Sequence, residues 1–178
     1  MEQYTEEINK LYQQAVYEME QWDLDKAQEH LGQVIEQDPQ HAGAHNKLGV
    51  IYARREDYTQ AEHYFEAAIQ LDPQLASAYS NLGNVYQVRE WTDRAISAYE
   101  KAIKIDQEHP TAHHNLGVLY KKIGRVGEGV EFIKKGAKMD KSKMKDDLRR
   151  SPSRKRTHNI LWLVVAGLVA WLLFFNIR

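Results

Sequence analysis

Histidine spacing is the first feature of this sequence that could carry chemistry. The chain has eight histidines and no cysteine, and His41 and His45, like His109 and His113, are four residues apart. On a helix, side chains four residues apart share one face, so such a pair can hold a metal ion. However, His41 and His109 precede their expected helices, and no Asp or Glu lies between the members of either pair. We therefore expect packing roles for these histidines, with no bound metal or other cofactor.

Motifs for nucleophilic catalysis and phosphate binding are also missing. The sequence has no Gly-x-Ser-x-Gly, no glycine-rich phosphate loop and no Walker-type lysine. The lack of cysteine excludes a disulfide framework, an iron–sulfur cluster and a cysteine nucleophile. The sequence therefore predicts that the protein is not an enzyme.

The elements that position the histidines repeat every 34 residues. Leu-Gly pairs begin at positions 48, 82 and 116, and a tyrosine follows each glycine after three positions. The two histidine pairs are themselves two periods apart. Several independent columns with one period of this length indicate stacked helix pairs. Two further columns are Ala27, Ala61 and Ala95, and Asp38, Asp72, Asp106 and Asp140.

This pattern resembles the tetratricopeptide repeat (TPR) family over residues 8–141. The third repeat is close to the family pattern, whereas the first and fourth depart from it. The resemblance implies an all-α fold, a right-handed α-solenoid of about four helix pairs. The second repeat carries the family's residues Leu48, Gly49, Tyr52, Ala61, Phe65, Ala68 and Pro73. We expect repeats at 8–41, 42–75, 76–109 and 110–141, with helices at 6–20, 24–37, 42–55, 58–71, 76–89, 92–105, 110–123 and 126–139.

The resemblance also assigns roles to single residues. His45 and His113 stand where the family usually has an aromatic side chain that packs on the preceding repeat. Trp22 and Trp91 fall in turns between helices, where we expect them to plug the turn; contact with a partner is the alternative. Gly129 and Gly136 cost about 1 kcal/mol each within a helix, so the last helix is expected to be the loosest. Residues 142–150 are expected to form a short capping helix within a basic linker at 142–158.

An apolar stretch follows this linker. Residues 160–175 contain no charged or strongly polar side chain, and with Asn176 and Ile177 the stretch reaches 18 residues. As a helix it would be about 27 Å long, close to the bilayer's hydrocarbon thickness of about 30 Å. A buried last helix is the alternative, but a helix that is apolar all round needs protein on every side. We therefore predict one C-terminal transmembrane helix at 159–177.

Basic residues immediately before this stretch predict its orientation. Residues 141–158 contain eight basic and two acidic side chains. By the positive-inside rule the N-terminal domain is cytosolic and the chain is tail-anchored in a membrane. A nucleic-acid-binding or nuclear-localisation patch is the alternative, which we reject because the predicted membrane anchor follows the basic run directly. The linker is also expected to attract anionic headgroups. Its membrane-flanking residues are Arg149, Arg150, Arg154, Lys155 and Arg156.

The resemblance further implies a binding surface, because the first helices of TPR pairs line a concave groove. Asn81 and Asn115 hold the same repeat position and resemble an asparagine ladder that holds a peptide backbone; alternatively, they cap or bridge neighbouring helices. Lys47 and Lys122 would favour acidic side chains or a terminal carboxylate. The groove candidates are Asn46, Lys47, Val50, Arg54, Ser77, Ser80, Asn81, Asn84, Gln87, Thr111, His114, Asn115, Val118, Lys121 and Lys122.

These features together predict a membrane-tethered adaptor without enzymatic activity. Its groove would hold a protein or peptide partner at the cytosolic face of a membrane. A self-assembling structural scaffold and an accessory subunit of a membrane protein complex are the alternatives. Association of copies is left open.

Truncation of the chain tests this modular organisation. We expect residues 1–158 to be soluble and helical, because the repeats bury their apolar faces on one another while the apolar stretch is removed. Circular dichroism and size-exclusion chromatography measure both properties. An unfolded or insoluble fragment would contradict the separation into a repeat domain and an anchor.

Overall fold

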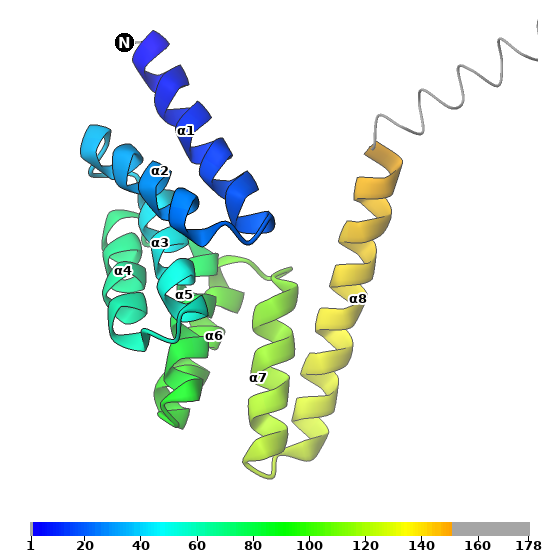
Figure 1. The fold of residues 1–178 in the computed structure, drawn as a ribbon. Helices are drawn as coiled ribbons and strands as arrows, with labels where there is room; N and C mark the ends of the chain where they lie inside the picture. The colour runs from blue at the N-terminus through cyan, green and yellow to red at the C-terminus, as the bar shows by residue number, and fades with distance from the viewer. Residues whose placement is uncertain (1, 151–178) are drawn as a thin grey trace, which may run out of the picture. The chain divides into compact units, whose positions relative to one another are not determined.

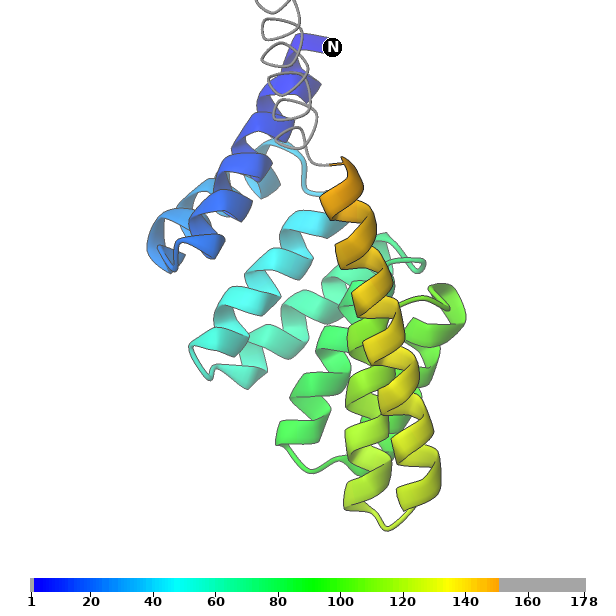
Figure 2. The same cartoon turned by 90° about the vertical axis from the view of Figure 1, so that its right-hand side faces the viewer.

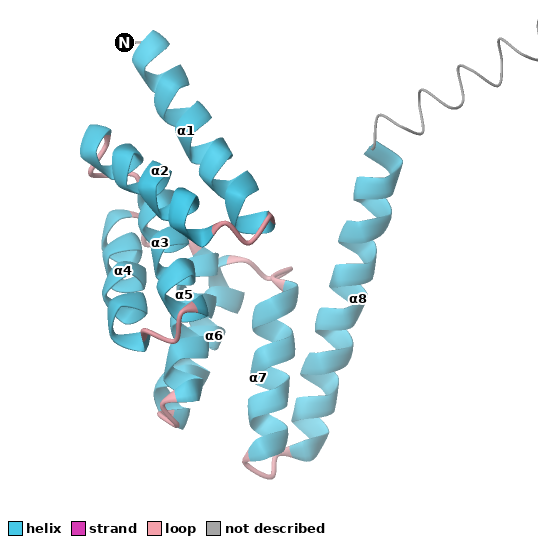
Figure 3. Ribbon diagram, in the orientation of Figure 1, coloured by secondary structure: helices cyan, strands magenta, loops and turns pink. Residues whose placement is uncertain are grey.

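The described part of the chain consists of helices and the turns between them. This computed structural model describes residues 2–150, which form eight helices and no strand (Figures 1 and 3). Helices α2 to α7 begin and end within one residue of the predicted bounds. The helices are α1 (Glu2–Glu20), α2 (Leu24–Gln37), α3 (Ala42–Arg54), α4 (Tyr58–Leu71), α5 (Ala76–Val88), α6 (Thr92–Ile105), α7 (Pro110–Lys122) and α8 (Val126–Arg150).

The two helices of a pair pack closely through a glycine on the first and an aromatic ring on the second. A Cβ atom added at Gly49 would lie 2.6 Å from Phe65 Cδ1, and one added at Gly83 would lie 2.6 Å from Tyr99 Cε1. Phe65 and Tyr99 are fully buried there. Each second helix also contacts the first helix of the next pair, from α2 with α3 to α6 with α7. The helix pairs therefore stack in chain order, as expected of a TPR solenoid.

The fourth pair uses glycine on both helices. A Cβ atom at Gly117 of α7 would lie 2.6 Å from the backbone oxygen of Gly129 on α8, and Ile133 lies beside it. Figure 2 shows α7 and the start of α8 side by side. Gly129, expected only to loosen the last helix, therefore allows the backbones of this pair to approach each other.

The turn inside each pair also follows the 34-residue period. Trp22, Glu56 and Glu90 have φ values of 63°, 63° and 61°, and Gly124, one period further, has a φ of 88°. These values belong to the left-handed region, which only glycine enters without a steric penalty. One strained position therefore recurs in all four turns, and three of the four carry a side chain there.

The last helix is longer than expected. Helix α8 runs unbroken to Arg150, so residues 142–150 continue it and do not form a separate capping helix. No proline interrupts the chain before Pro152. The chain divides into two compact units, residues 1–137 and 138–178. In the second unit, residues 138–150 are the described part.

The predicted membrane span, residues 159–177, lies outside the described residues. Within residues 2–150, no helix combines the length and the apolar character needed to cross a bilayer. Membrane anchoring therefore stays a prediction from the sequence. Among the predicted membrane-flanking residues, Arg149 is exposed, and its Nη1 atom lies 3.9 Å from Asp146 Oδ1.

Substitution of Glu56 by glycine tests the strain in these turns. The left-handed conformation costs a non-glycine residue roughly 1–2 kcal/mol, and glycine's larger entropy in the unfolded chain offsets part of this. We expect Glu56→Gly to stabilise the fold by roughly 0.5–1 kcal/mol in urea unfolding. Gly124→Ala is the opposite case and should destabilise by about 1 kcal/mol. Destabilisation by Glu56→Gly would show that these turns carry no such strain.

Candidate functional site

Three neighbouring first helices are joined by a row of hydrogen-bonded amides. On α3, Asn46 donates through Nδ2 to Ser77 Oγ (3.2 Å) and accepts at Oδ1 from Asn81 Nδ2 (3.0 Å), both on α5. One repeat further, Asn115 Nδ2 on α7 donates to Asn84 Oδ1 on α5 (2.7 Å). Asn81 and Asn115 thus bridge neighbouring helices. We call the surface formed by α3, α5 and α7 the first-helix face.

The predicted groove residues differ in exposure. Asn46 (6% exposed) and Ser80 (1% exposed) are buried, so their prediction as ligand-contacting residues is wrong. Both occupy the same repeat position, which faces into the stack, and Asn46 uses its amide between helices. The half-buried candidates are Lys47, Val50, Ser77, Asn81, Asn84, Gln87 and Asn115, and the exposed candidates are Arg54, Thr111, His114, Val118, Lys121 and Lys122.

Charge is distributed unevenly between the two helices of each pair. Helices α3, α5 and α7 contain no acidic residue, and α5 contains no charged residue at all. The second helices α2, α4 and α6 carry three, two and two acidic residues. The first-helix face is therefore uncharged at its centre, with cations on α3 and α7.

Exposed valines add apolar surface to this face. Val88 on α5 is 54% exposed and Val118 on α7 is 38% exposed. The groove prediction included Val118 but missed Val88. The repeat pattern could have identified Val88, because Val88 stands one period after Arg54 and one period before Lys122.

A buried tyrosine links the core to the amide row. The Tyr99 hydroxyl, on α6, lies 2.8 Å from both Asn84 Oδ1 and Gln87 Oε1 on α5. Burial raises the pKa of Tyr99, so this phenol stays protonated and acts as a donor. The amide of Asn84 therefore receives hydrogen bonds from Tyr99 and from Asn115, which fix its orientation. This part of the first-helix face is pre-organised by the packing of α5 on α6.

The spaced histidines make hydrogen bonds with backbone atoms. The Nδ1 atoms of His41 and His109 accept the backbone N–H of the residue three positions later (3.1 and 3.2 Å) at the starts of α3 and α7. The Nε2 atoms of His45 and His113 lie 3.1 and 3.0 Å from the backbone oxygen six residues earlier. In the part of the chain that the structure describes, no three His, Asp or Glu side chains cluster as metal ligands do.

The two tryptophans expected as turn plugs are exposed. Trp22 is 71% exposed beneath the Arg54 guanidinium (4.7 Å from the ring centroid), and Trp91 is 42% exposed. Trp22 has a left-handed backbone conformation, and Trp91 directly precedes α6. Arg89 and Arg94 stack on Trp91 at 4.9 and 5.0 Å.

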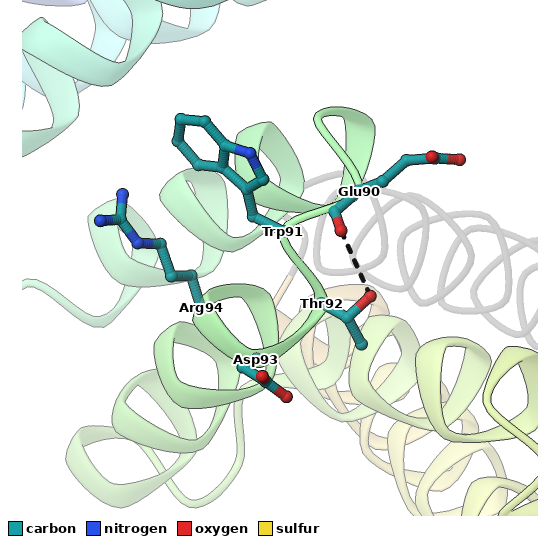
Figure 4. Close-up of a pocket in the computed structure, with 5 residues that line it drawn as sticks. All are labelled: Glu90, Trp91, Thr92, Asp93 and Arg94. Atoms are coloured by element: carbon teal, nitrogen blue, oxygen red, sulfur yellow. Dashed lines mark hydrogen bonds between the residues drawn. The ribbon is translucent and has the colours of Figure 1, made fainter.

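Trp91 also occupies a position where the earlier repeats place a capping residue. Asp57 and Asp23, one and two periods earlier, accept a backbone N–H of the next helix, whereas Trp91 makes no such bond. A missing N-cap costs about 1 kcal/mol. Trp91 and Arg94 border a shallow hollow of about 530 Å³, and Figure 4 shows them on the same side of the turn. The indole also packs on the Tyr86 ring of α5, with ring centroids 5.8 Å apart.

Replacement of His113 tests the one buried histidine among the described residues. Burial, reinforced by Lys135, lowers the pKa of His113 below its usual value near 6.5. Below that pH the unfolded chain binds the proton first, so stability falls as the pH decreases from 6.5 towards the folded pKa. We expect the free energy of unfolding of His113→Phe, measured with urea between pH 7.5 and 5, to lack this pH dependence. The dependence amounts to at most about 1.4 kcal/mol per pH unit. His45→Phe, at the equivalent half-buried position, is the control. An unchanged pH slope in His113→Phe would contradict the assignment.

Comparison with known proteins agrees with this geometry. Tetratricopeptide repeat models match residues 12–76 and 110–143, and a TPR repeat model matches residues 92–124. No curated protein matches the sequence. A crystal structure of MamA is 29% identical with a TM-score of 0.65, covering 78% of this chain and 81% of that chain.

Two other solved structures share the fold. The O-GlcNAc transferase of Thermobaculum terrenum is 25% identical with a TM-score of 0.64, over 66% of this chain and 22% of that chain. Pseudomonas aeruginosa PilF is 18% identical with a TM-score of 0.71, over 78% of this chain and 63% of that chain, a likeness in fold alone. The repeat columns, the stacked helix pairs and the family models together show that this chain contains tetratricopeptide repeats.

Proposed function

We propose that the protein is a membrane-tethered TPR adaptor without enzymatic activity. Its first-helix face would form a concave groove that holds an extended segment of a partner protein at the cytosolic side of a membrane. The observation that carries this proposal is the row of bridging amides beside exposed valines on a face without carboxylates. TPR repeats, which the comparisons identify, are typical of protein-interaction scaffolds.

The amide row suits a peptide backbone. Asn81 Nδ2 and Asn115 Nδ2 each donate to an amide oxygen of the neighbouring first helix, and Asn81 Oδ1 has no donor among the described residues. An amide fixed through its nitrogen presents its oxygen in one orientation, ready to accept a backbone N–H. Because the side chains are already ordered, little conformational entropy is lost when a peptide binds.

Side-chain preferences follow from the rest of the face. The exposed Val88 and Val118 favour apolar side chains of the partner. The exposed Lys121 has no ion-pair partner among the described residues and would favour a carboxylate. We therefore expect an extended segment in which apolar and acidic residues alternate over α5 and α7.

The tether rests on the sequence of residues 160–177, whose length and apolar character suit a membrane span. Basic residues before this stretch favour a cytosolic repeat domain. A tethered groove meets membrane-bound partners at a raised effective concentration, without any new contact.

The end face of the first repeat argues against a scaffold in which copies continue the stack. Ile51, Val85 and Leu119 are at most 1% exposed, but Tyr17, at the same repeat position, is 57% exposed. Lys10 is exposed at the position where the inner repeats bury alanine. A charged residue at a position that stacking would bury makes continuous stacking costly.

Substitution of the exposed valines tests peptide binding. Peptides are selected from a displayed random library on the full chain, and their affinity is then measured for Val88→Asp/Val118→Asp. We expect at least a tenfold loss, about 1.4 kcal/mol, because two added carboxylates repel an acidic segment and remove apolar contact. Both valine side chains are exposed, so helicity and stability should hold.

Two controls locate the effect. His63→Asp/Gln70→Asp introduces two carboxylates on exposed positions of α4, and Ser80→Ala changes a buried position of α5. Both should keep wild-type affinity. Binding that survives Val88→Asp/Val118→Asp but is lost in the α4 variant would move the binding surface to the second helices and rule out the proposed groove.

A further inference from the structure

Polar side chains replace apolar ones at three positions of the third repeat. Asn84 stands where each of the other repeats has valine, and Tyr99 stands where the first two repeats have Leu31 and Phe65. Gln87 stands where the first two repeats have methionine and alanine. The helix pairs of those two repeats pack without these polar groups, so packing does not require them. Three such departures in one repeat indicate a role other than stacking.

The three side chains meet at one point. The Tyr99 hydroxyl lies 2.8 Å from Asn84 Oδ1 and 2.8 Å from Gln87 Oε1. Its one hydrogen is shared between the two oxygens, as in a three-centre hydrogen bond. Tyr99 is fully buried on α6, whereas Asn84 and Gln87 are half-buried on α5. We call Asn84, Gln87 and Tyr99 the polar cluster.

The shared hydrogen bond fixes which end of each amide is available. Both amide oxygens face the phenol, and Asn84 Oδ1 also accepts from Asn115 Nδ2 at 2.7 Å. The nitrogens Asn84 Nδ2 and Gln87 Nε2 have no acceptor among the described residues. Each amide nitrogen carries two N–H donors. The polar cluster therefore presents hydrogen-bond donors at the middle helix of the first-helix face.

We propose that the polar cluster binds a side-chain carboxylate of the partner, with Asn84 and Gln87 as donors and Tyr99 as the residue that positions them. This inference rests on the proposed peptide groove and names the partner residue at its centre, an aspartate or a glutamate. Hydrogen bonds to a carboxylate are stronger than those to a neutral oxygen, so two donors favour the ionised group. Helices α3, α5 and α7 carry no acidic residue that would repel it.

The place of the cluster favours a side chain over a chain end. Helix α5 contacts α3 on one side and α7 on the other. A segment that lies across all three helices has further residues on both sides of the cluster, whereas a C-terminal carboxylate at α5 would leave one neighbouring helix uncovered. Lys121 of α7 stands at the repeat position of Gln87 and adds positive charge beside the cluster.

Removal of the hydroxyl tests the positioning role of Tyr99. Tyr99→Phe should keep the fold, because Phe65 fills the equivalent place beside Gly49. Peptides selected on the full chain are compared with counterparts in which each Asp or Glu is replaced in turn by Asn or Gln. At one position the wild type should prefer the acidic peptide at least about tenfold. Tyr99→Phe and Asn84→Val/Gln87→Ala should each remove most of this preference.

A double-mutant cycle separates positioning from packing. Because Tyr99 acts through the two amides, Tyr99→Phe should not change the affinity further in Asn84→Val/Gln87→Ala. Phe65→Leu is the matched control, because it changes the equivalent buried ring and introduces the residue of the first repeat. It should lower the stability but keep the preference for the acidic peptide. Independent, additive effects of Tyr99→Phe and Asn84→Val/Gln87→Ala would overturn the positioning role.

The remaining outcomes are separable from these. Equal affinity of the wild type for the acidic peptides and all their amide counterparts would assign the donors to carbonyl oxygens and overturn the carboxylate. A preference that amidation of the peptide's C-terminus abolishes would assign them to the chain end and overturn the side chain. Binding that is insensitive to Val88→Asp/Val118→Asp removes the proposed groove and this inference with it. Binding that is sensitive to Val88→Asp/Val118→Asp but not to Asn84→Val/Gln87→Ala removes only the inference.

Discussion

Close approach of the two helices in each pair is the constraint on which the rest of this structure depends. At Gly83 there is no room for a Cβ atom, because the Tyr99 ring fills the space beside the backbone. The same contact carries the Tyr99 hydroxyl to Asn84 and Gln87 on the other helix. One glycine therefore determines both how α5 lies on α6 and how the amides of the first-helix face are oriented. Packing and the proposed binding surface are coupled through this contact.

The 34-residue period was enough to predict six helices to within one residue, because the period reflects packing that each repeat must satisfy. It was not enough for α8. The resemblance to the family ends at residue 141, but nothing in residues 140–150 stops a helix, and the structure continues it. The strained turns were missed for a related reason. Only Gly124 signals a left-handed residue, whereas Glu56 and Glu90 take the conformation because the stacked pairs impose it.

The sequence predicted which helices carry the groove candidates but not which of their side chains are exposed. All the groove candidates lie on α3, α5 or α7, yet Asn46 and Ser80 are buried. On an α-helix a rotation of one position, about 100°, changes a side chain from exposed to buried, and the stacking of neighbouring repeats determines this rotation. A repeat column alone does not contain that information. It does identify equivalent residues, which is how Val88 could have been found from Arg54 and Lys122.

Departures from the repeat pattern carry the information that the pattern cannot. Stacking demands small and apolar residues at fixed positions, so residues there indicate the fold and say little about a partner. Trp91 stands where Asp23 and Asp57 cap their helices, and it loses that cap while its indole remains partly exposed. The indole packs on the Tyr86 ring and contacts the Arg89 and Arg94 guanidinium groups, and these contacts offset part of the lost cap. The departure at Trp91 therefore exchanges an N-cap for ring contacts across the turn between α5 and α6.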